Sequence, residues 1–329
     1  MHWRMISAFS VTATVRCFCL KKISPMNPDS THHVLGRQVA YPDRYSPDIL
    51  VRVDRAGNRM AHHIDEVHLP FTGLDLWNAY EVSALTDAGA PVNFIMRLLY
   101  PCESRYIVES KSLKLYLNAF NMSRCGATTA EVAGFLSSTV AHDLSALLET
   151  RVEVVVETPR EAGRHTVTSP GCACEPPVEW EYWGVGELSS APLASYKEDV
   201  DLLHDNCVGG GVLTGMTDLL RSRCKITSQP DWGDLYLYMR GDRLPSVDAL
   251  LRYIVSFRDE NHFHEEVVEM IYKALYSHFS PEELLVMAFY TRRGGIDINP
   301  VRANRKELID RFCPHIVHFE RIAVKSPRQ

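Results

Sequence analysis

Two similar segments recur along the chain, and this internal repeat constrains the fold more than any other feature of the sequence. Ser112–Phe120 (SLKLYLNAF) can be laid over Ala249–Phe257 (ALLRYIVSF), so that Tyr116 falls on Tyr253. Each segment is followed by a second helical pattern and then by a strand-like run. Because the order of elements repeats together with the residues, the pattern predicts a duplicated strand–strand–helix–helix–strand unit. The fold class is therefore α+β, each copy being a sheet with helices on one face.

Hydrophobic periodicity gives the expected elements of both copies. The first copy is predicted to contain two strands, two helices and a further strand, at Pro91–Tyr100, Arg105–Val108, Ser110–Phe120, Ala127–Leu148 and Arg151–Glu157. The second is predicted to contain a strand, two helices and a strand, at Leu235–Met239, Ser246–Phe257, Glu265–Phe279 and Leu284–Thr291. Ser246 is expected to cap its helix, because a serine side chain accepts a hydrogen bond from the first free backbone N–H groups.

A proline-rich stretch separates the copies and marks the domain boundary. The predicted organisation is an N-terminal extension at residues 1–33, a first module at 34–160, a linker at 161–195 and a second module at 196–329. Met26 is interpreted as the functional start, which would make the residues before it dispensable.

Charge and cysteine content exclude several classes of protein. With 41 acidic and 35 basic residues the formal net charge is -6, and no long basic stripe predicts direct nucleic-acid binding. No apolar run is long enough to cross a bilayer. The nine cysteines are irregularly spaced, and the Cys17/Cys19 and Cys172/Cys174 pairs lack the spacing of a structural zinc site. We therefore expect no metal, and reduced thiols in a cytoplasmic protein.

The segment CKITSQPDWG, from Cys224 to Gly233, carries the most chemistry. Its QPDWG part is typical of a turn, and a turn can bring the Cys224 thiol beside the Asp231 carboxyl group. A thiol attacks as thiolate, and a carboxylic acid can protonate the atom that gains negative charge. The alternative is a buried structural cysteine beside a turn aspartate.

Three other segments are candidates for ligand binding. Lys111 and Lys114 lie three positions apart near a helix start and favour a phosphate, although they could equally form a solvated basic face. The FHEE segment at 263–266 offers a ring and a carboxylate for a guanine-like edge, or simply an acidic helix start. Arg292 and Arg293 precede two glycines, as in a phosphate loop or an ordinary basic turn. No G-x-G-x-x-G follows a predicted strand, so a Rossmann-type cofactor site is not expected.

These segments together resemble one family. ESKSLKLY, CKITSQPDWG, FHEE and YTRRGGIDINP look like motifs of the 7-cyano-7-deazaguanine reductases of queuosine biosynthesis, and Leu69–Ser83 is similar to the bimodular class of that family. The resemblance covers roughly residues 34–305. It implies two tandem tunnelling-fold modules, each an antiparallel sheet with helices on one face, in a homodimer with one composite site per chain.

The resemblance also implies roles for particular residues. Cys224 matches the nucleophile and Asp231 the proton donor. Substrate-binding positions are matched by Val108, Glu109, Ser110, His264 and Glu265. NADPH-binding positions are matched by Ser110, Lys111, Arg293 and Gly294. The implied reaction is the four-electron reduction of the nitrile of 7-cyano-7-deazaguanine to 7-aminomethyl-7-deazaguanine through a Cys224 thioimidate, with two NADPH used per turnover.

Two other functions use the same residues. Cys224, Glu109 and Lys111 could serve a nitrile hydrolase, which would need no NADPH and would release ammonia. A tunnelling-fold module could also bind a purine or pterin without catalysis, but loss of Cys224 or Asp231 would be expected then, and both are present.

Overall fold

The computed structural model describes residues 44–164, 179–193, 195–204 and 207–312. The predicted extension at 1–33 and the Cys17/Cys19 and Cys172/Cys174 pairs lie outside the described residues. Among the described residues, no helix is both long and apolar enough to cross a bilayer.

The predicted repeat of strand–strand–helix–helix–strand is confirmed, but the first strand of each copy was not predicted, and the strand expected at Arg105–Val108 pairs with a segment before the first copy. The first copy consists of β2 (Thr72–Leu85), β3 (Pro91–Pro101), α2 (Ser110–Asn118), α3 (Thr129–Leu148) and β5 (Glu153–Glu157). The second consists of β7 (Val208–Cys224), β8 (Pro230–Leu244), α5 (Val247–Ser256), α6 (His264–Phe279) and β10 (Glu283–Tyr290). The first hairpin of each copy contains one register shift, between Ala79 and Val82 in β2 and between Thr217 and Leu220 in β7. Ser246 caps α5 as expected, since its hydroxyl accepts from the N–H of Ala249.

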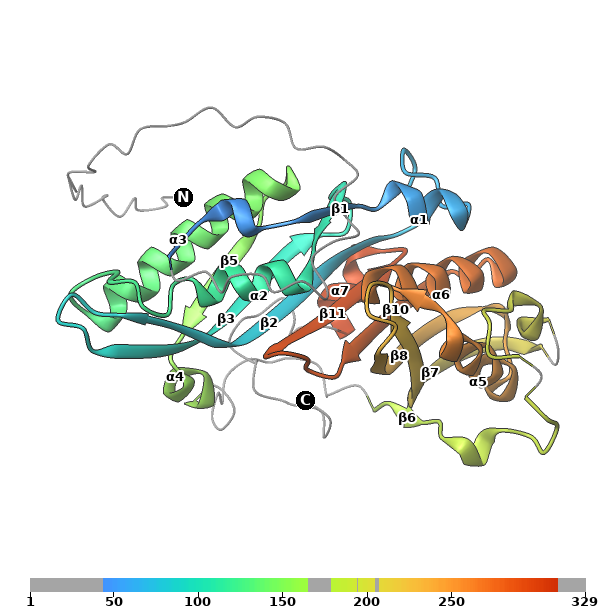
Figure 1. Cartoon of the computed structure of the whole chain (residues 1–329). Helices are drawn as coiled ribbons and strands as arrows, with labels where there is room; N and C mark the ends of the chain where they lie inside the picture. Colours follow the sequence, from blue (N-terminus) through green and yellow to red (C-terminus); the bar gives the residue numbers. More distant parts are fainter. Residues whose placement is uncertain (1–43, 165–178, 194, 205–206, 313–329) are drawn as a thin grey trace, which may run out of the picture.

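A strand that the sequence analysis did not predict joins the copies. β11 (Ile296–Ala303) pairs antiparallel with β10 and, from Ile296 opposite Ala79 to Ala303 opposite Thr72, with β2. Nine of the described strands thus form one sheet in the order β5-β3-β2-β11-β10-β8-β7-β6, with β9 (Asn261–His262) paired to β7. The two halves lie side by side along it (Figure 1).

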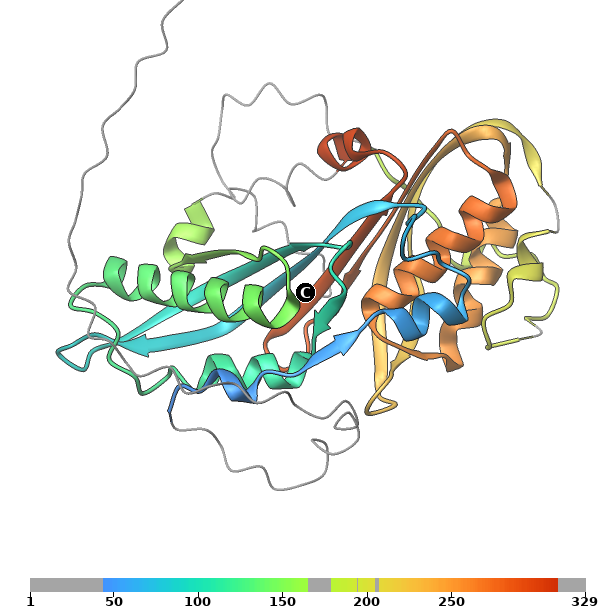
Figure 2. The same cartoon turned by 90° about the horizontal axis from the view of Figure 1, so that it is seen from above.

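Helices α2, α3, α5 and α6 lie on one face of the sheet, where they form two apolar cores, one in each copy. The short helix α7 (Lys306–Phe312) was not predicted and packs on the opposite face, where Leu308 and Phe312 meet Leu76 and Leu285. Figure 2 shows α7 across the sheet from α6. The join between the copies is therefore covered on both faces.

The segment before the first copy ties both halves together. β1 (Arg52–Asp54) pairs with β4 (Tyr106–Val108), and the adjoining α1 (Ala56–Ala61) lies beside α6 (Figure 1). Arg59 donates two hydrogen bonds of 2.8–2.9 Å to Glu269 of α6, and Arg302 bridges Glu269 and Asp75 at 2.8 Å. Arg55 forms an ion pair with Asp75. All five side chains are buried, and each charge has an opposite partner, as a buried ion requires.

The remaining described elements are short. They are η2 (Pro47–Ile49), α4 (Pro159–Arg164), β6 (Glu181–Tyr182), η3 (Val185–Glu187), η4 (Val200–Leu203) and η5 (Phe257–Asp259). The described part of the predicted linker packs on the second copy: Trp183 is buried in its core, and Arg252 of α5 donates to Ser189.

Candidate active site

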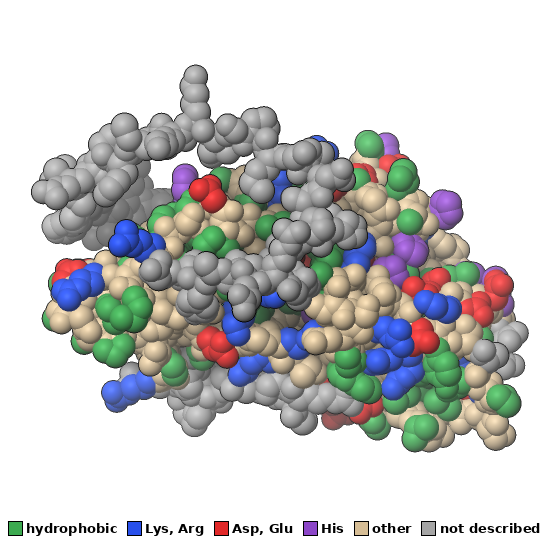
Figure 3. Space-filling model, in the orientation of Figure 1, with side chains coloured by type: hydrophobic (Ala, Val, Ile, Leu, Met, Phe, Trp, Pro, Cys, Tyr) green, Lys and Arg blue, Asp and Glu red, His purple; other side chains and the backbone are tan. Residues whose placement is uncertain are grey.

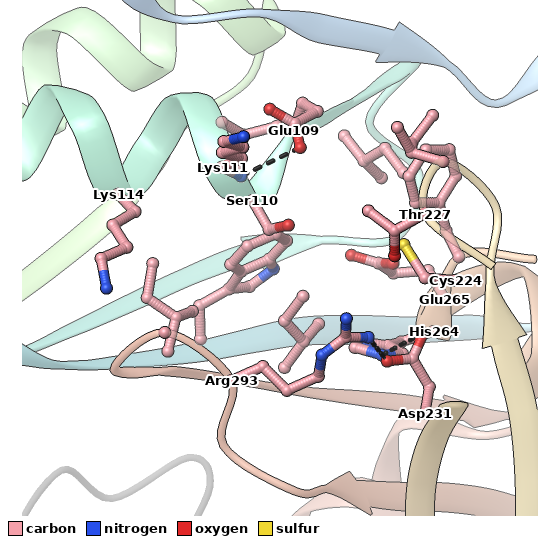
Figure 4. Close-up of a pocket in the computed structure, with 18 of the residues that line it drawn as sticks. Glu109, Ser110, Lys111, Lys114, Cys224, Thr227, Asp231, His264, Glu265 and Arg293 are labelled. Carbon is pink, nitrogen blue, oxygen red and sulfur yellow. Dashed lines mark hydrogen bonds and ion pairs between the residues drawn. The ribbon is translucent and has the colours of Figure 1, made fainter. Parts of the chain in front are cut away.

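A cavity of about 240 Å³ lies where the two copies meet, on the helix-covered face of the sheet. Its apolar floor includes Trp77 of β2 and Ile296 and Ile298 of β11, so the strand that joins the copies also forms the base of the cavity. Every residue proposed for the site lines it: Val108, Glu109, Ser110 and Lys111 from the first copy, and Cys224, Asp231, His264, Glu265, Arg293 and Gly294 from the second. Figure 4 shows Glu109, Ser110 and Lys111 across the cavity from Cys224 and Asp231.

The β7–β8 turn brings Cys224 and Asp231 together. The N–H of Cys224 donates to the carbonyl of Gln229 at 2.8 Å, and the turn contains Ser228 in the left-handed conformation with φ 53°. Asp231 lies opposite Ser222 in the ladder. Because side chains alternate across a strand, Cys224, two positions after Ser222, projects from the same face as Asp231. The thiol and the carboxyl group therefore enter one cavity, as predicted. The turn itself lies at residues 225–229, however, because Asp231 and Gly233 of the QPDWG segment belong to strand β8.

Asp231 is buried between two cationic or potentially cationic groups. Its carboxylate forms an ion pair with Arg293, and His264 Nε2 lies 3.4 Å from Oδ2 (Figure 4). Burial by itself would raise the pKa of Asp231, but the hydrogen bonds and charges of His264 and Arg293 outweigh it and lower that pKa. Asp231 is thus ionised in the free protein near neutral pH, so it must take up a proton before it can deliver one.

Glu265 has the opposite electrostatic environment. It is 2% exposed, and its Oε1 has no hydrogen-bond partner among the described residues. Burial, followed by the charge of Asp75, raises the pKa of Glu265 to about 8, against the opposing effect of Arg55. A buried carboxyl group with an unused oxygen facing a cavity can pair with the N–H donors of a planar heterocycle.

The start of α2 supplies the opposite wall. Glu109 caps the helix, its carboxylate accepting from the N–H groups of Lys111 at 2.9 Å and Ser112 at 2.7 Å. Glu109 is therefore the N-cap of α2 in the free protein. A carboxylate has about four acceptor positions, so capping leaves capacity for a ligand.

Three cationic side chains reach the cavity beside these groups: Lys111, Lys114 and Arg293. Lys114 pairs with Glu81 at 3.2 Å and rests on the glycine turn, since a Cβ at Gly294 would lie 3.3 Å from the lysine Cδ and Nζ. Gly294 has φ 59°, a conformation that favours glycine. Lys and Arg side chains gather around the middle of the face in Figure 3, where α2 and the β10–β11 hairpin lie. Such a group suits a phosphorylated ligand.

Comparisons with known proteins agree with this geometry. Residues 41–156 match the family model described as nitrile reductase, 7-cyano-7-deazaguanine-reductase N-term, and residues 230–308 match the model described as QueF-like protein. A curated NADPH-dependent 7-cyano-7-deazaguanine reductase of Desulfotalea psychrophila is 37% identical over 83% of this chain and 93% of its own length. That of Hahella chejuensis is 39% identical over 85% and 96%. The chain belongs to this reductase family.

A further relative of the same name, from an Azoarcus species, is 38% identical over 83% of this chain and 91% of its own length. Membership confirms the resemblance identified from the four motifs, and it makes the chain an oxidoreductase of the NADPH-dependent nitrile reductase family. A solved archaeosine synthase QueF-Like in the apo form matches 30% of the chain with a TM-score of 0.25 and 15% identity, too slight a likeness to bear on the fold.

Sequence reasoning did not identify the floor of the cavity. Trp77 lies in a segment noted only for its resemblance, and Ile296 and Ile298 lie in a strand that was not predicted. The alternation of apolar residues in IDINPVRA could have indicated that strand. The contact of Asp231 with both His264 and Arg293 was equally unforeseen, because it joins three separate motifs.

Proposed function

We propose that this chain reduces the nitrile of 7-cyano-7-deazaguanine to the aminomethyl group, with NADPH as reductant and Cys224 as the covalent nucleophile. The observation that carries the proposal is the composite cavity: Cys224 and Asp231 line it from one copy, and Ser110 and Lys111 from the other. A module that only binds a purine would have no use for a thiol and a basic helix start in the same cavity.

The purine-like ring of the substrate would lie between the two walls. Glu265 offers an unused buried oxygen, and His264 and Glu109 border the same space. Val108 is buried at the cavity wall and Ser110 is exposed at the helix start, so together they can contact the ring and its edge. In this pose the nitrile carbon points to Cys224, whose side chain comes from the β7–β8 turn.

Addition of the thiol balances without any further reagent. The Cys224 thiol gives its proton to the ionised Asp231 carboxylate, and the thiolate forms a bond to the nitrile carbon. Asp231 then passes that proton to the nitrile nitrogen, which yields a neutral thioimidate on Cys224. The low pKa that His264 and Arg293 give Asp231 keeps its carboxylate ionised, so that it is free to take the thiol proton. The same low pKa makes the protonated acid a strong donor to the more basic nitrogen that forms at the nitrile.

The basic side of the cavity fits NADPH. Lys111 and Arg293 can pair with phosphate oxygens, Ser110 can donate a hydrogen bond, and Gly294 leaves room for the Lys114 side chain beside them. When bound, NADPH supplies a hydride in each of two rounds, which accounts for four electrons. We expect one cofactor site to be used sequentially, with Cys224 released as the thiol after the first round.

Three further features belong to the proposal. We infer a homodimer, a cytoplasmic location and a place in queuosine biosynthesis, in which the aminomethyl product would go on to tRNA modification without direct nucleic-acid binding by this chain. They rest on the family to which the chain belongs.

Covalent capture tests the proposal directly. Incubation with 7-cyano-7-deazaguanine and no NADPH should add one substrate mass to the intact protein, and Cys224→Ala should abolish the adduct. Cys125→Ala, which removes another half-buried free thiol, is the matched control and should retain it. With NADPH, two cofactors should be oxidised per amine formed. Ammonia release without NADPH oxidation would favour the nitrile hydrolase, and an adduct that survives on Cys224→Ala would exclude this cysteine as the nucleophile.

A further inference from the structure

Tyr290, the last residue of β10, lies directly against a side chain of the site without lining the cavity itself. Its ring stacks on the imidazole of His264, with centroids 3.9 Å apart and planes 20° from parallel. Tyr290 is fully buried, and its hydroxyl has no hydrogen-bond partner among the described residues. The hydroxyl therefore adds no hydrogen bond to stability, and burying it unpaired is costly. What the ring contacts is thus the better guide to its role.

The β8 strand is shaped to admit this ring. Gly233 lies opposite Tyr290 in the ladder, and a Cβ built on Gly233 would lie 3.2 Å from Cε1 and 3.3 Å from Cδ1 of the ring. The N–H of Thr291 donates to the carbonyl of Trp232 at 2.8 Å and holds the end of β10 in register. Gly233 of β8 therefore creates the space in which the tyrosine ring lies.

His264 needs an external support because it is the first residue of α6, where one side of the side chain has no preceding helical turn. Its Nε2 lies 3.4 Å from Asp231 Oδ2, while its Nδ1 is buried and has no partner among the described residues. No hydrogen bond on the Nδ1 side fixes the rotation of the ring, so the stacked Tyr290 is the contact that keeps Nε2 directed at Asp231.

We propose that Tyr290 is a positioning residue for the reduction, and that its aromatic face, seated over Gly233, holds the His264 imidazole in line with the Asp231 carboxylate. The inference rests on the function proposed above. It assigns no proton transfer to Tyr290, because burial, Asp231 and Glu265 raise its pKa well above the usual value and keep the hydroxyl neutral. Arg293 pairs with the other oxygen of Asp231. Loss of the stack would therefore leave the Asp231 carboxylate with the Arg293 contact and without the His264 contact.

Two substitutions separate the ring from the hydroxyl. Tyr290→Phe keeps the stacked face and should retain kcat within about twofold, since the hydroxyl has no partner to lose. Tyr290→Leu removes the face and should lower kcat by roughly 10- to 100-fold, the range expected for misplacing a reacting group by about 1 Å, with little change in KM for NADPH. The acidic limb of its kcat–pH profile should also shift to higher pH than in wild type, because an Asp231 less well paired with His264 has a higher pKa.

A measurement independent of activity completes the test. The ring C–H signals of His264, assigned by comparison with His264→Gln, should be shifted upfield by the tyrosine ring in the NMR spectra of wild type and Tyr290→Phe, and should lose that shift in Tyr290→Leu. Phe289→Leu, which removes an aromatic ring from the other face of the same strand, should leave the signals in place. If Tyr290→Leu fails to fold, Gly233→Ala displaces the ring and should alter the same signals and lower kcat.

The outcomes are distinct. A folded Tyr290→Leu with unchanged histidine signals and an unchanged pH profile would overturn the positioning role even if the nitrile is reduced. If Tyr290→Leu loses the upfield shift of the His264 signals but the wild type reduces no nitrile, the stacking contact would be supported and the proposed function rejected.

Discussion

At the scale of single residues, charge state decides what Asp231 can do. His264 and Arg293 lower its pKa in spite of burial, so the free protein presents a carboxylate beside the Cys224 thiol. A carboxylate can remove the thiol proton and then return it to the nitrile nitrogen. In the proposed mechanism one group would serve both halves of the addition, and the cation and the imidazole beside it would make the protonated acid a better donor.

Asp231→Asn should lower turnover by about 10²- to 10⁴-fold, the usual contribution of a positioned acid or base, because an amide has the same shape but carries no transferable acidic proton. Steady-state kinetics with thermal unfolding would check it. The melting temperature should stay close to that of wild type, which would show that the loss of turnover does not come from misfolding. Near-normal turnover in this variant would remove Asp231 from the mechanism.

Glu265 gives a prediction about stability and pH. Its pKa is about 8 in the folded protein and returns to its ordinary value of 4.5 on unfolding. Folding therefore takes up a proton between these values, and the stability that depends on the neutral carboxyl group is complete below about pH 4.5 and is lost as the pH rises through 8.

Glu265→Gln keeps the side chain neutral at every pH. The melting temperature of the variant, relative to wild type, should therefore rise from pH 5 to about pH 8 and level off above it. Thermal melts across this range measure it, with the exposed Glu282→Gln as control. Parallel curves for wild type and Glu265→Gln would show that Glu265 is ionised in the folded protein.

At the scale of elements, α2 and the β10–β11 hairpin present the cations of the cavity on short, well-fixed segments. α2 is capped by its own Glu109, and the hairpin turns through Gly294 and Gly295, both with positive φ. A Cβ at Gly295 would lie 2.5 Å from the carboxyl carbon of Glu81, so the glycine also lets Glu81 reach Lys114. These local features hold basic side chains in place before any ligand arrives.

Lys111→Met removes one of these charges and keeps the length of the side chain. We expect its KM for NADPH to rise by about tenfold or more, the equivalent of one charge-assisted hydrogen bond, while covalent adduct formation with the nitrile stays intact. Lys273→Met, on α6 and outside the cavity lining, is the control.

Arg293→Gln should also raise the KM for NADPH, and it should slow the addition of the thiol as well, because Arg293 pairs with Asp231. Equal use of NADH and NADPH by wild type would contradict the phosphate assignment.

At the scale of the whole molecule, the site exists only because the copies share a sheet. The β2–β11 ladder and the buried Arg59–Glu269 pair cross the join, and the cavity lies on it. Splitting the chain would expose a paired strand edge on each half and leave buried charges without partners, which is strongly destabilising.

Residues 34–160 and 161–329, expressed separately, should each be inactive in the nitrile assay; the second fragment keeps β6 and the buried Trp183. Co-expression should restore activity, because the severed linker costs effective concentration while the ladder and ion pairs can re-form. Size-exclusion chromatography of the co-expressed halves would show whether they associate. Reduction of the nitrile by the second half alone at the rate of the full chain would disprove the composite site.

The sequence by itself determined the local structure and the chemistry on offer. Helix starts at Thr128 and Ser246 follow from side chains that cap the nearest N–H groups, because these interactions join residues only a few positions apart. QPDWG indicated a turn before β8, but the turn lies at residues 225–229, and the segment after Gln229 belongs to the strand. The repeat and the motif segments likewise needed no knowledge of the fold to indicate two copies and a thiol beside an acid.

The tertiary structure decided what those residues became. Arg59 and Glu269 are 210 positions apart, and no local pattern shows that a polar segment at residues 34–60 would bury two arginines. The pairing of β11 with β2, the stack of Tyr290 on His264 and the opposing pKa shifts of Asp231 and Glu265 have the same origin. Each depends on which groups meet across the sheet and how far water is excluded there, and both are properties of the packed chain as a whole.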